Sequence, residues 1–354
     1  MAVTTVHADN KVTRWVKDYW NEYVRDSRFR RYMGPTINAP IQVKIDLTKM
    51  RGEKLSLPLI TRLQNSGVTG DNQLVDNEES LANYADSCDV DQLRHGVVVG
   101  EMEQQKTVLD LYQAAKPALK NWSMENLRDT IIARALSPNV DGLTAYASTS
   151  EANKDIWLAA NDDRILFGAA KSNNSGNDHS ASLLNVDSTS DTLSRAIVSL
   201  AKRMCKKADP HIRPIKVRDE EENYILFVPS EAFRDLKDDM GTTLKDAEVR
   251  GRKNPLFTDT DLYYDGVIIR EVPEISTLSG VGNGGIDVAP CFMMGAQAMW
   301  IAWAKKTEFR KRKEDDYGNL MGVGIREIRE VKKSFFNSVQ HGMLTLYVSG
   351  VADT

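Results

Sequence analysis

The stretch from Val288 to Ala304, VAPCFMMGAQAMWIAWA, contains no charged side chain and is followed directly by Lys305 and Lys306. A chain that carries such a stretch must bury it, either in a lipid bilayer or in its own core. The stretch is shorter than the roughly 20 strongly apolar residues of a membrane-spanning helix, and Pro290 and Gly295 dilute it further. We therefore expect a buried core segment and no membrane partner.

The expected helices and strands are mixed without the regular strand–helix alternation of a doubly wound sheet, which favours an α+β fold. Alternating or short apolar runs predict strands over 41–47, 54–60, 92–99, 224–228, 263–272 and 342–350. Three- and four-residue spacings predict helices over 12–24, from Glu101 through a bend at Pro117, from a cap at Ser123, over 191–207 and from a cap at Ser230. The polar stretch KSNNSGNDHSAS, 171–182, is expected to be a mobile surface loop.

Charge and cysteine content exclude some functional classes. The chain has 354 residues, a net charge of -4 and a pI near 5.9, whereas proteins whose main role is to bind nucleic acid carry a basic excess. Cys88, Cys205 and Cys291 are odd in number and far apart, which predicts no disulfide framework and indicates a reducing compartment. The N-terminal sequence MAVTTVHADNKV lacks a secretory signal pattern, so we expect synthesis in a cytosol.

A glycine-rich segment, GVGNGG from Gly280 to Gly285, matches the spacing G-x-G-x-x-G. A dinucleotide site needs a strand before these glycines and a helix N-terminus after them, because the helix end binds the pyrophosphate. The residues that follow, IDVAPCF, contain a proline and no clear helix start. We interpret the segment as a loop between two core segments.

A second segment, GVTGDNQLVDNEESL at 67–81, combines glycines with a cluster of acidic residues. It has no lysine and so cannot be a Walker A phosphate loop. Counted from Asp71, the next two ligand positions of a calcium loop hold Gln73 and Val75, which do not bind calcium through carboxylates. A metal site at Asp71, Asp76, Glu78 or Glu79 is the minor alternative to a solvated acidic surface.

No other residue pattern predicts catalysis. The five histidines lack metal-ligand spacing, so we expect each to be a surface or strand residue. Ser230 lacks the glycines of a nucleophile elbow and is interpreted as a helix cap. We therefore predict no catalytic residue, no cofactor and no metal.

The N-terminal region combines an aromatic stripe with a basic cluster. Aromatic side chains recur at helical spacing at Trp15, Tyr19, Trp20 and Tyr23, and arginines follow at Arg25, Arg28, Arg30 and Arg31. One interpretation is a solvated helix with arginines near its C-terminus. The other is an amphipathic arm that lies on another subunit and faces a polyanion.

The order of these parts resembles the major capsid proteins, or coat proteins, of tailed double-stranded-DNA bacteriophages, whose fold is shared with herpesvirus capsid proteins. The resemblance spans nearly the whole chain. It is carried by GVTGDNQLVDNEESL with VDQLRHGV after it, by NPLFTDTDLYYDGVIIREVPEI, by CFMMGAQAMWIAWAKK and by FFNSVQHGMLTLYVSG.

The resemblance implies an α+β fold with an N-terminal arm, an extended β-hairpin loop, a peripheral domain with a long spine helix, and an axial domain. The implied division is an arm at 1–39, a peripheral strand at 40–48, the extended loop at 49–97, the peripheral domain with its spine helix at 98–145, the axial domain at 146–304 and the C-terminal part of the peripheral domain at 305–354.

The function implied is that of a structural protein, not an enzyme, that self-assembles as hexamers and pentamers into an icosahedral head around double-stranded DNA. Scaffolding, portal and decoration proteins would be partners, the virion the location and the host cytoplasm the place of synthesis. Trp15, Tyr19, Trp20, Tyr23, Asp71, Asp76, Glu78 and Glu79 would contact neighbouring subunits, and Arg25, Arg28, Arg30 and Arg31 would face the packaged DNA. Two alternatives stay open: a protein-compartment shell of the same fold, and a nucleotide- or metal-dependent enzyme.

Overall fold

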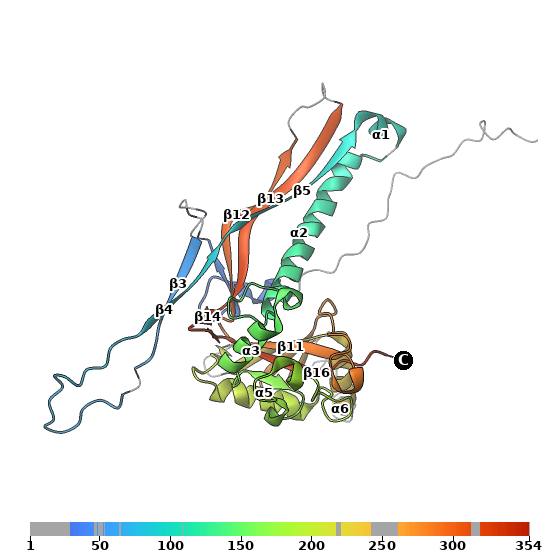
Figure 1. The fold of residues 1–354 in the computed structure, drawn as a ribbon. Helices are drawn as coiled ribbons and strands as arrows, with labels where there is room; N and C mark the ends of the chain where they lie inside the picture. Colours follow the sequence, from blue (N-terminus) through green and yellow to red (C-terminus); the bar gives the residue numbers. More distant parts are fainter. Residues whose placement is uncertain are drawn as a thin grey trace, which may run out of the picture. The chain divides into compact units, whose positions relative to one another are not determined.

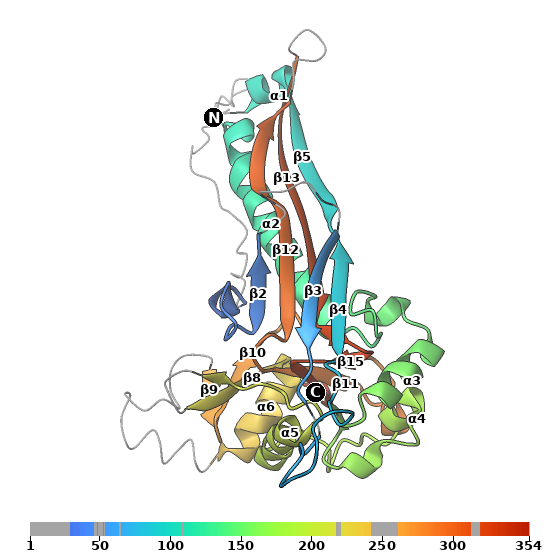
Figure 2. The same ribbon diagram turned by 90° about the vertical axis from the view of Figure 1, so that its left-hand side faces the viewer.

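A computed structural model describes residues 29–45, 48, 52, 54–63, 65–107, 109–216, 221–241, 261–312 and 319–353. The chain divides into two compact units. Among the described residues, the small unit contains 92–127 and 306–327, and the large unit contains 29–91, 128–305 and 328–353. Figures 1 and 2 show the elements of both units.

The centre of the large unit is a seven-stranded sheet with the order β6-β16-β11-β8-β10-β9, in which β7 also pairs with β8. Its strands are β6 Ile165–Phe167, β7 Ile215–Lys216, β8 Glu222–Val228, β9 Asp261–Tyr264, β10 Val267–Glu271, β11 Val288–Met294 and β16 Met343–Ser349. The last strand, β16, pairs with β11 and with β6. The predicted boundary between the axial domain, 146–304, and the C-terminal part, 305–354, separates β16 from its partners β6 and β11. The sequence analysis therefore did not anticipate this pairing.

Both faces of β11 are covered, which explains why its sequence has no charge. On one face, Cys291 and Met293 pack in a core with the helices α5 Arg195–Lys207 and α6 Ser230–Asp239. On the other face, the ring of Phe292 lies 5.1 Å from that of Phe227 and 6.4 Å from that of Phe29. The prediction of a buried core segment is confirmed, and no helix in the described part of the chain is long and apolar enough to cross a membrane.

Residues 146–190 are more ordered than the sequence indicated. They form α3 Glu151–Ala160, β6 and α4 His179–Leu183, and Asp178 caps α4 by accepting a hydrogen bond from the Ala181 amide at 2.9 Å. His179 is fully buried beside Trp157 and Tyr347. The prediction of a mobile surface loop is wrong for 179–182, which form the start of α4 with His179 and Ser182 buried, whereas 171–178 are mostly exposed turns, as a surface loop would be.

A second sheet has the order β1-β2-β12-β13-β5, with strands β1 Met33–Gly34, β2 Ile41–Lys44, β5 Asp91–Gly100, β12 Met299–Lys311 and β13 Leu320–Lys333. The strand predicted at 41–47 is observed over Ile41–Lys44, while residues 46 and 47 lie outside the described residues. The long strand β13 was not predicted. Its sequence, LMGVGIREIREVKK, alternates apolar with charged or glycine residues over much of its length.

In the small unit, one face of β5 and β13 packs against α2. The apolar contacts are made by Val97, Val323 and Ile325 with Ala115 and Leu119 of α2. Two helices, α1 Glu101–Lys106 and α2 Leu111–Ala135, replace the single helix predicted from Glu101. The start of α2 is fixed by Asp110, whose carboxylate accepts a hydrogen bond from the Gln113 amide at 3.0 Å.

Three further sequence predictions need correction. Ser123 does not cap a new helix but lies within α2, where its hydroxyl donates to Glu327 at 3.2 Å. Ser230 is the first residue of α6 rather than its cap, and its hydroxyl donates to Glu271 at 2.7 Å. The single strand predicted at 263–272 is the hairpin β9–β10, because Asp265 and Gly266 both adopt positive φ, at 47° and 71°, and turn the chain.

Candidate inter-subunit surfaces

The acidic motif lies on a hairpin that reaches away from the seven-stranded sheet (Figure 1). Strands β3 Lys54–Ile60 and β4 Asn83–Asp89 pair antiparallel from Lys54 opposite Asp89 to Ile60 opposite Asn83. The residues 61–82 join them, and we call this segment the acidic loop. The strand predicted at 54–60 is confirmed, and the hairpin as a whole belongs to the large unit.

The acidic loop presents both charge and apolar surface to solvent. Asp71, Asp76 and Glu78 are exposed, as the sequence predicted for a solvated acidic segment. Glu79 is half-buried and accepts a hydrogen bond from the amide of Asn65 at 2.8 Å, which holds the two sides of the loop together. Four large apolar side chains of the loop are also exposed: Leu63, Leu74, Val75 and Leu81.

Turn geometry explains the glycines and the acids of this motif. Gly67 and Gly70 have φ of 75° and 69°, and Asp76 has φ of 68°, in the left-handed region that glycine, asparagine and aspartate tolerate best. The Asn77 amide donates to the Leu74 carbonyl at 3.0 Å and closes a turn there. Within the described residues, no group of three or more His, Cys, Asp or Glu side chains is placed to hold a metal ion.

The base of the hairpin is fixed by a buried carboxylate, Asp86, that sequence analysis missed. It accepts hydrogen bonds from the Trp300 indole at 3.1 Å, from the Phe335 amide at 3.3 Å and from the ammonium group of Lys332. Lys332 also donates to the carbonyl of Ser87 at 2.8 Å. Burying one charge alone costs several kcal/mol, so the ion pair and its hydrogen bonds are needed together.

Apolar packing completes this base. Cys88, Leu55 and Leu57 of the hairpin pack with Trp300 and Ala302 of β12. Burial, with a smaller effect of Glu330, raises the pKa of the Cys88 thiol to about 12, so the group stays protonated and unreactive at neutral pH. A sequence signal existed for this site: Leu55 and Leu57 are two residues apart on β3, and Asp86 and Cys88 are two residues apart on β4, so each pair lies on one face of its strand.

The structure describes only the end of the predicted arm. Phe29 is fully buried, with its ring 5.0 Å from that of Phe227, and it anchors the chain to the seven-stranded sheet. Arg30 and Arg31 follow in a 3-10 turn, Arg30–Tyr32, and are exposed. The helix predicted at 12–24, with Trp15, Tyr19, Trp20 and Tyr23, and the arginines Arg25 and Arg28 lie outside the described residues.

The glycine-rich segment has the geometry of a packed loop. Gly282 donates its amide to the Ile286 carbonyl at 2.9 Å, and a Cβ added to Gly282 would lie 2.6 Å from a carbon of Ile286. The segment leads into strand β11, not into a helix. It therefore lacks the helix N-terminus on which a dinucleotide pyrophosphate binds.

Two basic side chains of the large unit, Lys333 and His179, are buried. Lys333 donates to the Ser137 carbonyl at 3.1 Å and to the Gln340 side chain at 3.0 Å, and burial lowers the pKa of its ammonium group to about 7. Burial, helped by Lys154, lowers the pKa of His179 to about 4. The prediction that each histidine is a surface or strand residue is wrong for His179, which begins α4.

Comparisons with known proteins agree with one another. Residues 3–348 match the protein family described as phage capsid protein. A curated relative, the major capsid protein of Pseudomonas phage KPP25, is 25% identical over 372 residues, which cover 95% of this chain and 94% of the relative.

Two solved structures extend the likeness to the fold. The capsid asymmetric unit of cyanophage Pam1 is 35% identical, with a TM-score of 0.92 and complete coverage, 100% of both chains. The capsid of Ralstonia phage GP4 is 22% identical, with a TM-score of 0.76 and the same 100% coverage, and supports the fold alone. The chain therefore belongs to the phage capsid protein family, and it is a structural protein of the phage head shell.

Proposed function

We propose that this chain is the subunit whose hexamers and pentamers build an icosahedral head around double-stranded DNA. The proposal depends on the geometry of the hairpin formed by β3 and β4 and on the surface of its acidic loop. Its base is fixed by the buried Asp86, while the acidic loop exposes carboxylates and large apolar side chains together. Such a surface is typical of a segment that is covered in an assembly, and heterologous contacts that close at fixed angles produce rings or shells.

Electron microscopy of the purified protein, alone and with a scaffolding partner, tests this proposal. We expect closed shells or capsomers. A protein that stays monomeric under every assembly condition would overturn it.

Contacts between subunits are assigned to two segments. In this proposal the acidic loop reaches a neighbouring subunit, with Asp71, Asp76, Glu78 and Glu79 setting the register through ion pairs. Trp15, Tyr19, Trp20 and Tyr23 would bind along another neighbour. Segments that wrap neighbours add buried area without enlarging each core, and obligate interfaces reach roughly 2,000 Å² or more.

The domain roles follow the same proposal. Residues 1–39 would be the arm, 40–48 a peripheral strand, 49–97 the extended loop, 98–145 the peripheral domain with α2 as its spine helix, 146–304 the axial domain and 305–354 the C-terminal part. The position of β16 between β6 and β11 supports adding Met343–Ser349 to the axial sheet.

DNA contact is assigned to Arg25, Arg28, Arg30 and Arg31, which would face the interior of the head. The exposure of Arg30 and Arg31 supports this, and a net charge of -4 for the whole chain is compatible with weak, salt-dependent contacts to phosphate. Scaffolding, portal and decoration proteins are proposed partners, and the host cytoplasm is the proposed place of synthesis.

We further propose that the chain catalyses no reaction. The support is the loop geometry of Gly280–Gly285 and the solvated carboxylates of the acidic loop. Calorimetry with a dinucleotide and with divalent cations is expected to give no binding heat, and saturable binding lost on Glu79→Gln would favour an enzyme. The remaining alternative is a protein-compartment shell of the same fold. The contents of the assembled particles distinguish it from a phage head, because a compartment shell would hold protein cargo in place of DNA.

A further inference from the structure

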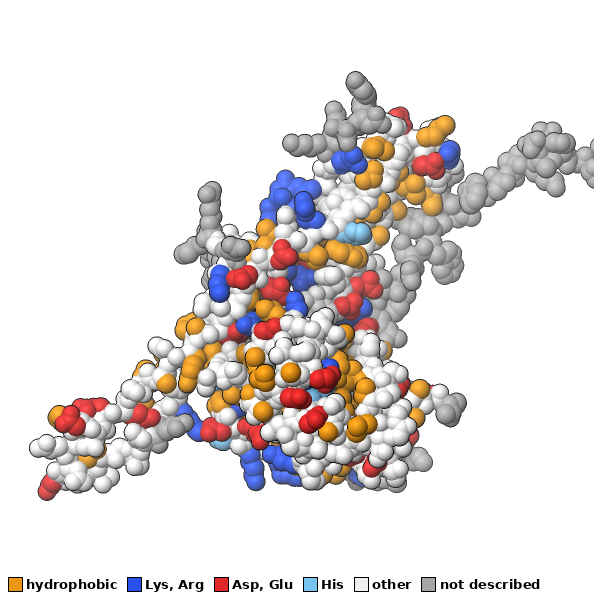
Figure 3. Space-filling model, in the orientation of Figure 1, with side chains coloured by type: hydrophobic (Ala, Val, Ile, Leu, Met, Phe, Trp, Pro, Cys, Tyr) orange, Lys and Arg blue, Asp and Glu red, His pale blue; other side chains and the backbone are white. Residues whose placement is uncertain are grey.

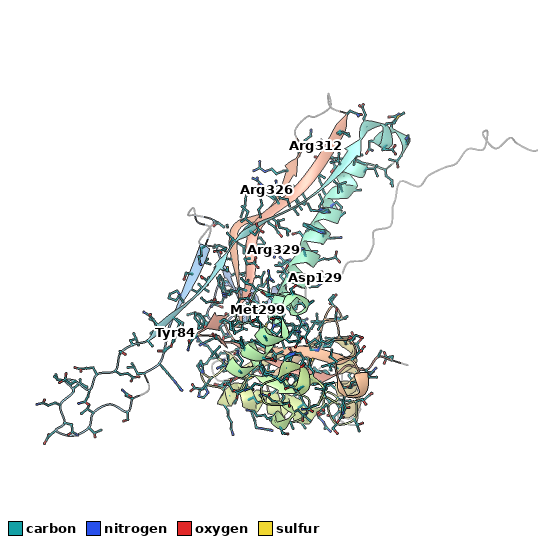
Figure 4. All side chains as sticks on the ribbon, viewed as in Figure 1. Tyr84, Asp129, Met299, Arg312, Arg326 and Arg329 are labelled. Atoms are coloured by element: carbon teal, nitrogen blue, oxygen red, sulfur yellow. The ribbon has the colours of Figure 1, made fainter. Side chains whose placement is uncertain are left out.

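A pocket of about 380 Å³ lies in the large unit, between the hairpin and β2. Residues 57–59 of β3 form one wall, and Gln42 and Lys44, on one face of β2, form another. Figure 4 labels Tyr84 on β4, the partner strand of the first wall, and Met299 on β12, the partner strand of the second. A ligand in this pocket would therefore contact the hairpin and β2 at the same time.

Basic side chains line much of the rest of the pocket. His211 and Arg213 belong to the loop between α5 and β7, and His341 lies in the turn before β16. With Lys44 they make four basic residues from three separate parts of the chain. Among the described residues that line the pocket there is no aspartate or glutamate. The pocket is therefore positively charged.

The two permanent cations of the pocket have no counter-charge. Lys44 and Arg213 make no ion pair and no side-chain hydrogen bond with another described residue. The two carboxylates next to the loop that carries Arg213 have partners of their own: Asp209 pairs with Arg62 at 2.9 Å, and Asp163 accepts a hydrogen bond from the Asp209 amide at 2.9 Å. An anion in the pocket would supply the missing charge.

The two histidines of the pocket each keep a ring nitrogen for a ligand. Nδ1 of His211 lies 2.7 Å from the Ala208 carbonyl, which can only accept a hydrogen bond, so Nε2 is the nitrogen that remains. The ring of His341 lies 5.1 Å from that of Phe336, and neither of its nitrogens has a hydrogen-bond partner in the described part of the chain. Burial, helped by Arg164, lowers the pKa of His341 to about 4, so the ring is neutral at pH 7 and keeps one N–H to donate.

We propose that this pocket binds a small organic phosphate, with its phosphate group at Lys44 and Arg213. A phosphate monoester carries about −1.5 to −2 charges at pH 7, which balances these two cations. A guanidinium group can also bind two phosphate oxygens at once. This inference goes beyond the proposed shell function, because it assigns the subunit a small-molecule site.

The apolar walls indicate that the ligand has an organic part. The pocket volume falls within the range of roughly 300–1,000 Å³ that is typical of small-molecule sites, and it leaves room beyond a phosphate group. Leu59 and Phe336 supply apolar surface to it. Figure 3 shows that apolar side chains follow the strands of the hairpin and that acidic side chains gather on the acidic loop. The organic part therefore meets apolar strand surface in the pocket.

Calorimetry on the unassembled subunit, in a phosphate-free buffer, tests the proposal with three probes. Phenyl phosphate joins a phosphate group to an aromatic ring, benzoate replaces the phosphate with a carboxylate, and inorganic phosphate lacks the ring. We expect phenyl phosphate to bind at least roughly tenfold more tightly than benzoate, because it brings more negative charge to the two cations. It should bind at least roughly threefold more tightly than inorganic phosphate, because its ring is buried.

Each probe can contradict one part of the proposal. Benzoate that binds as tightly as phenyl phosphate would overturn the assignment of a phosphate group. Inorganic phosphate that binds as tightly would overturn the assignment of an organic part. Phenyl phosphate that gives no saturable binding at millimolar concentration would overturn the site altogether.

Charge removal tests the two cations. Lys44→Gln with Arg213→Gln should raise the dissociation constant for phenyl phosphate at least roughly tenfold. The urea unfolding curve without ligand should stay nearly unchanged, because neither side chain has an ion pair to lose. Lys207→Gln with Lys216→Gln neutralises two exposed lysines that do not line the pocket, and this matched control should bind like the wild type. Equal binding by the two double variants would overturn the inference.

Histidine side-chain signals in NMR spectra locate the ligand directly. On titration of histidine-labelled subunit with phenyl phosphate, we expect the signals of His211 and His341 to shift. The signals of His95 in the small unit and of the buried His179 should stay in place, because neither residue lines the pocket. Saturable shifts that spare both His211 and His341 would place the ligand elsewhere and overturn the inference. These measurements use the subunit alone, so their failure leaves the proposed assembly into a shell standing.

Discussion

At the residue scale, the hairpin depends on one buried carboxylate. Asp86→Asn keeps the shape of the side chain but removes the carboxylate that pairs directly with the buried ammonium group of Lys332. We expect the free energy of unfolding of the unassembled subunit to fall by about 3 kcal/mol, measured by urea denaturation. Asp89→Asn, an exposed change on the same strand, should cost less than about 0.5 kcal/mol.

The double variant Asp86→Asn with Lys332→Met removes both charges. It should be more stable than Asp86→Asn alone, because no uncompensated ion remains in the core. Equal stability of Asp86→Asn and Asp89→Asn would show that the ion pair does not hold the base of the hairpin.

A second residue-scale prediction concerns pH and the buried His179. Burial lowers the pKa of this imidazole from 6.5 to about 4. In the unfolded chain the ring takes up its proton near pH 6.5, while the folded state resists protonation until about pH 4. The unfolded state thus binds more protons in this window, and stability falls as pH falls through it.

The measurement is the free energy of unfolding at several pH values between 7 and 4.5. We expect the wild type to lose about 1 kcal/mol per pH unit more than His179→Phe below pH 6.5. Parallel pH profiles for the wild type and His179→Phe would contradict the assignment.

At the scale of elements, the acidic loop can be changed without touching the base of its hairpin. Glu78→Lys with Glu79→Lys should impair assembly at least roughly tenfold, measured as shell yield, while the unfolding curve of the subunit stays nearly unchanged. Glu79→Gln keeps an oxygen to accept the Asn65 hydrogen bond, so it should assemble better than the double reversal. Normal shells from the double reversal would remove the proposed role of these carboxylates.

The elements that sequence patterns predicted well are those whose apolar residues form a pattern visible in the local sequence. The strand at Lys54–Ile60, the β5 strand and the terminal strand β16 agree with their predicted ranges within two residues. The helix α5 also agrees, although it starts at Arg195, four residues after Asp191 of the predicted segment. The strand β3 alternates, α5 has a helical stripe, and β16 is a short run that is buried throughout, and local sequence makes each of these patterns visible.

The elements that sequence patterns missed depend on contacts between distant residues. Ser123 resembles a helix cap locally, but it lies within α2 and its partner is Glu327 on strand β13. His179 lies in a polar stretch, and only packing against Trp157 and Tyr347 buries it. Asp86 looks like one more exposed acid until Lys332, far away in sequence, is brought beside it. Local patterns cannot report pairings of this kind.

At the scale of the whole molecule, a single subunit leaves large apolar side chains exposed to solvent. Leu63, Leu74, Val75 and Leu81 are each 57% to 66% exposed on the acidic loop. Their burial against other copies would supply part of the free energy of association. Membership of the phage capsid protein family agrees with that arrangement.

The central claim is that copies of this chain build the head shell through contacts made by the acidic loop. Electron microscopy of shells assembled from purified protein tests this claim most directly. The account predicts closed icosahedral particles in which residues 61–82 of each subunit lie on a neighbour. Closed particles in which these residues contact only their own subunit, or protein that forms no particle under any condition, would contradict it.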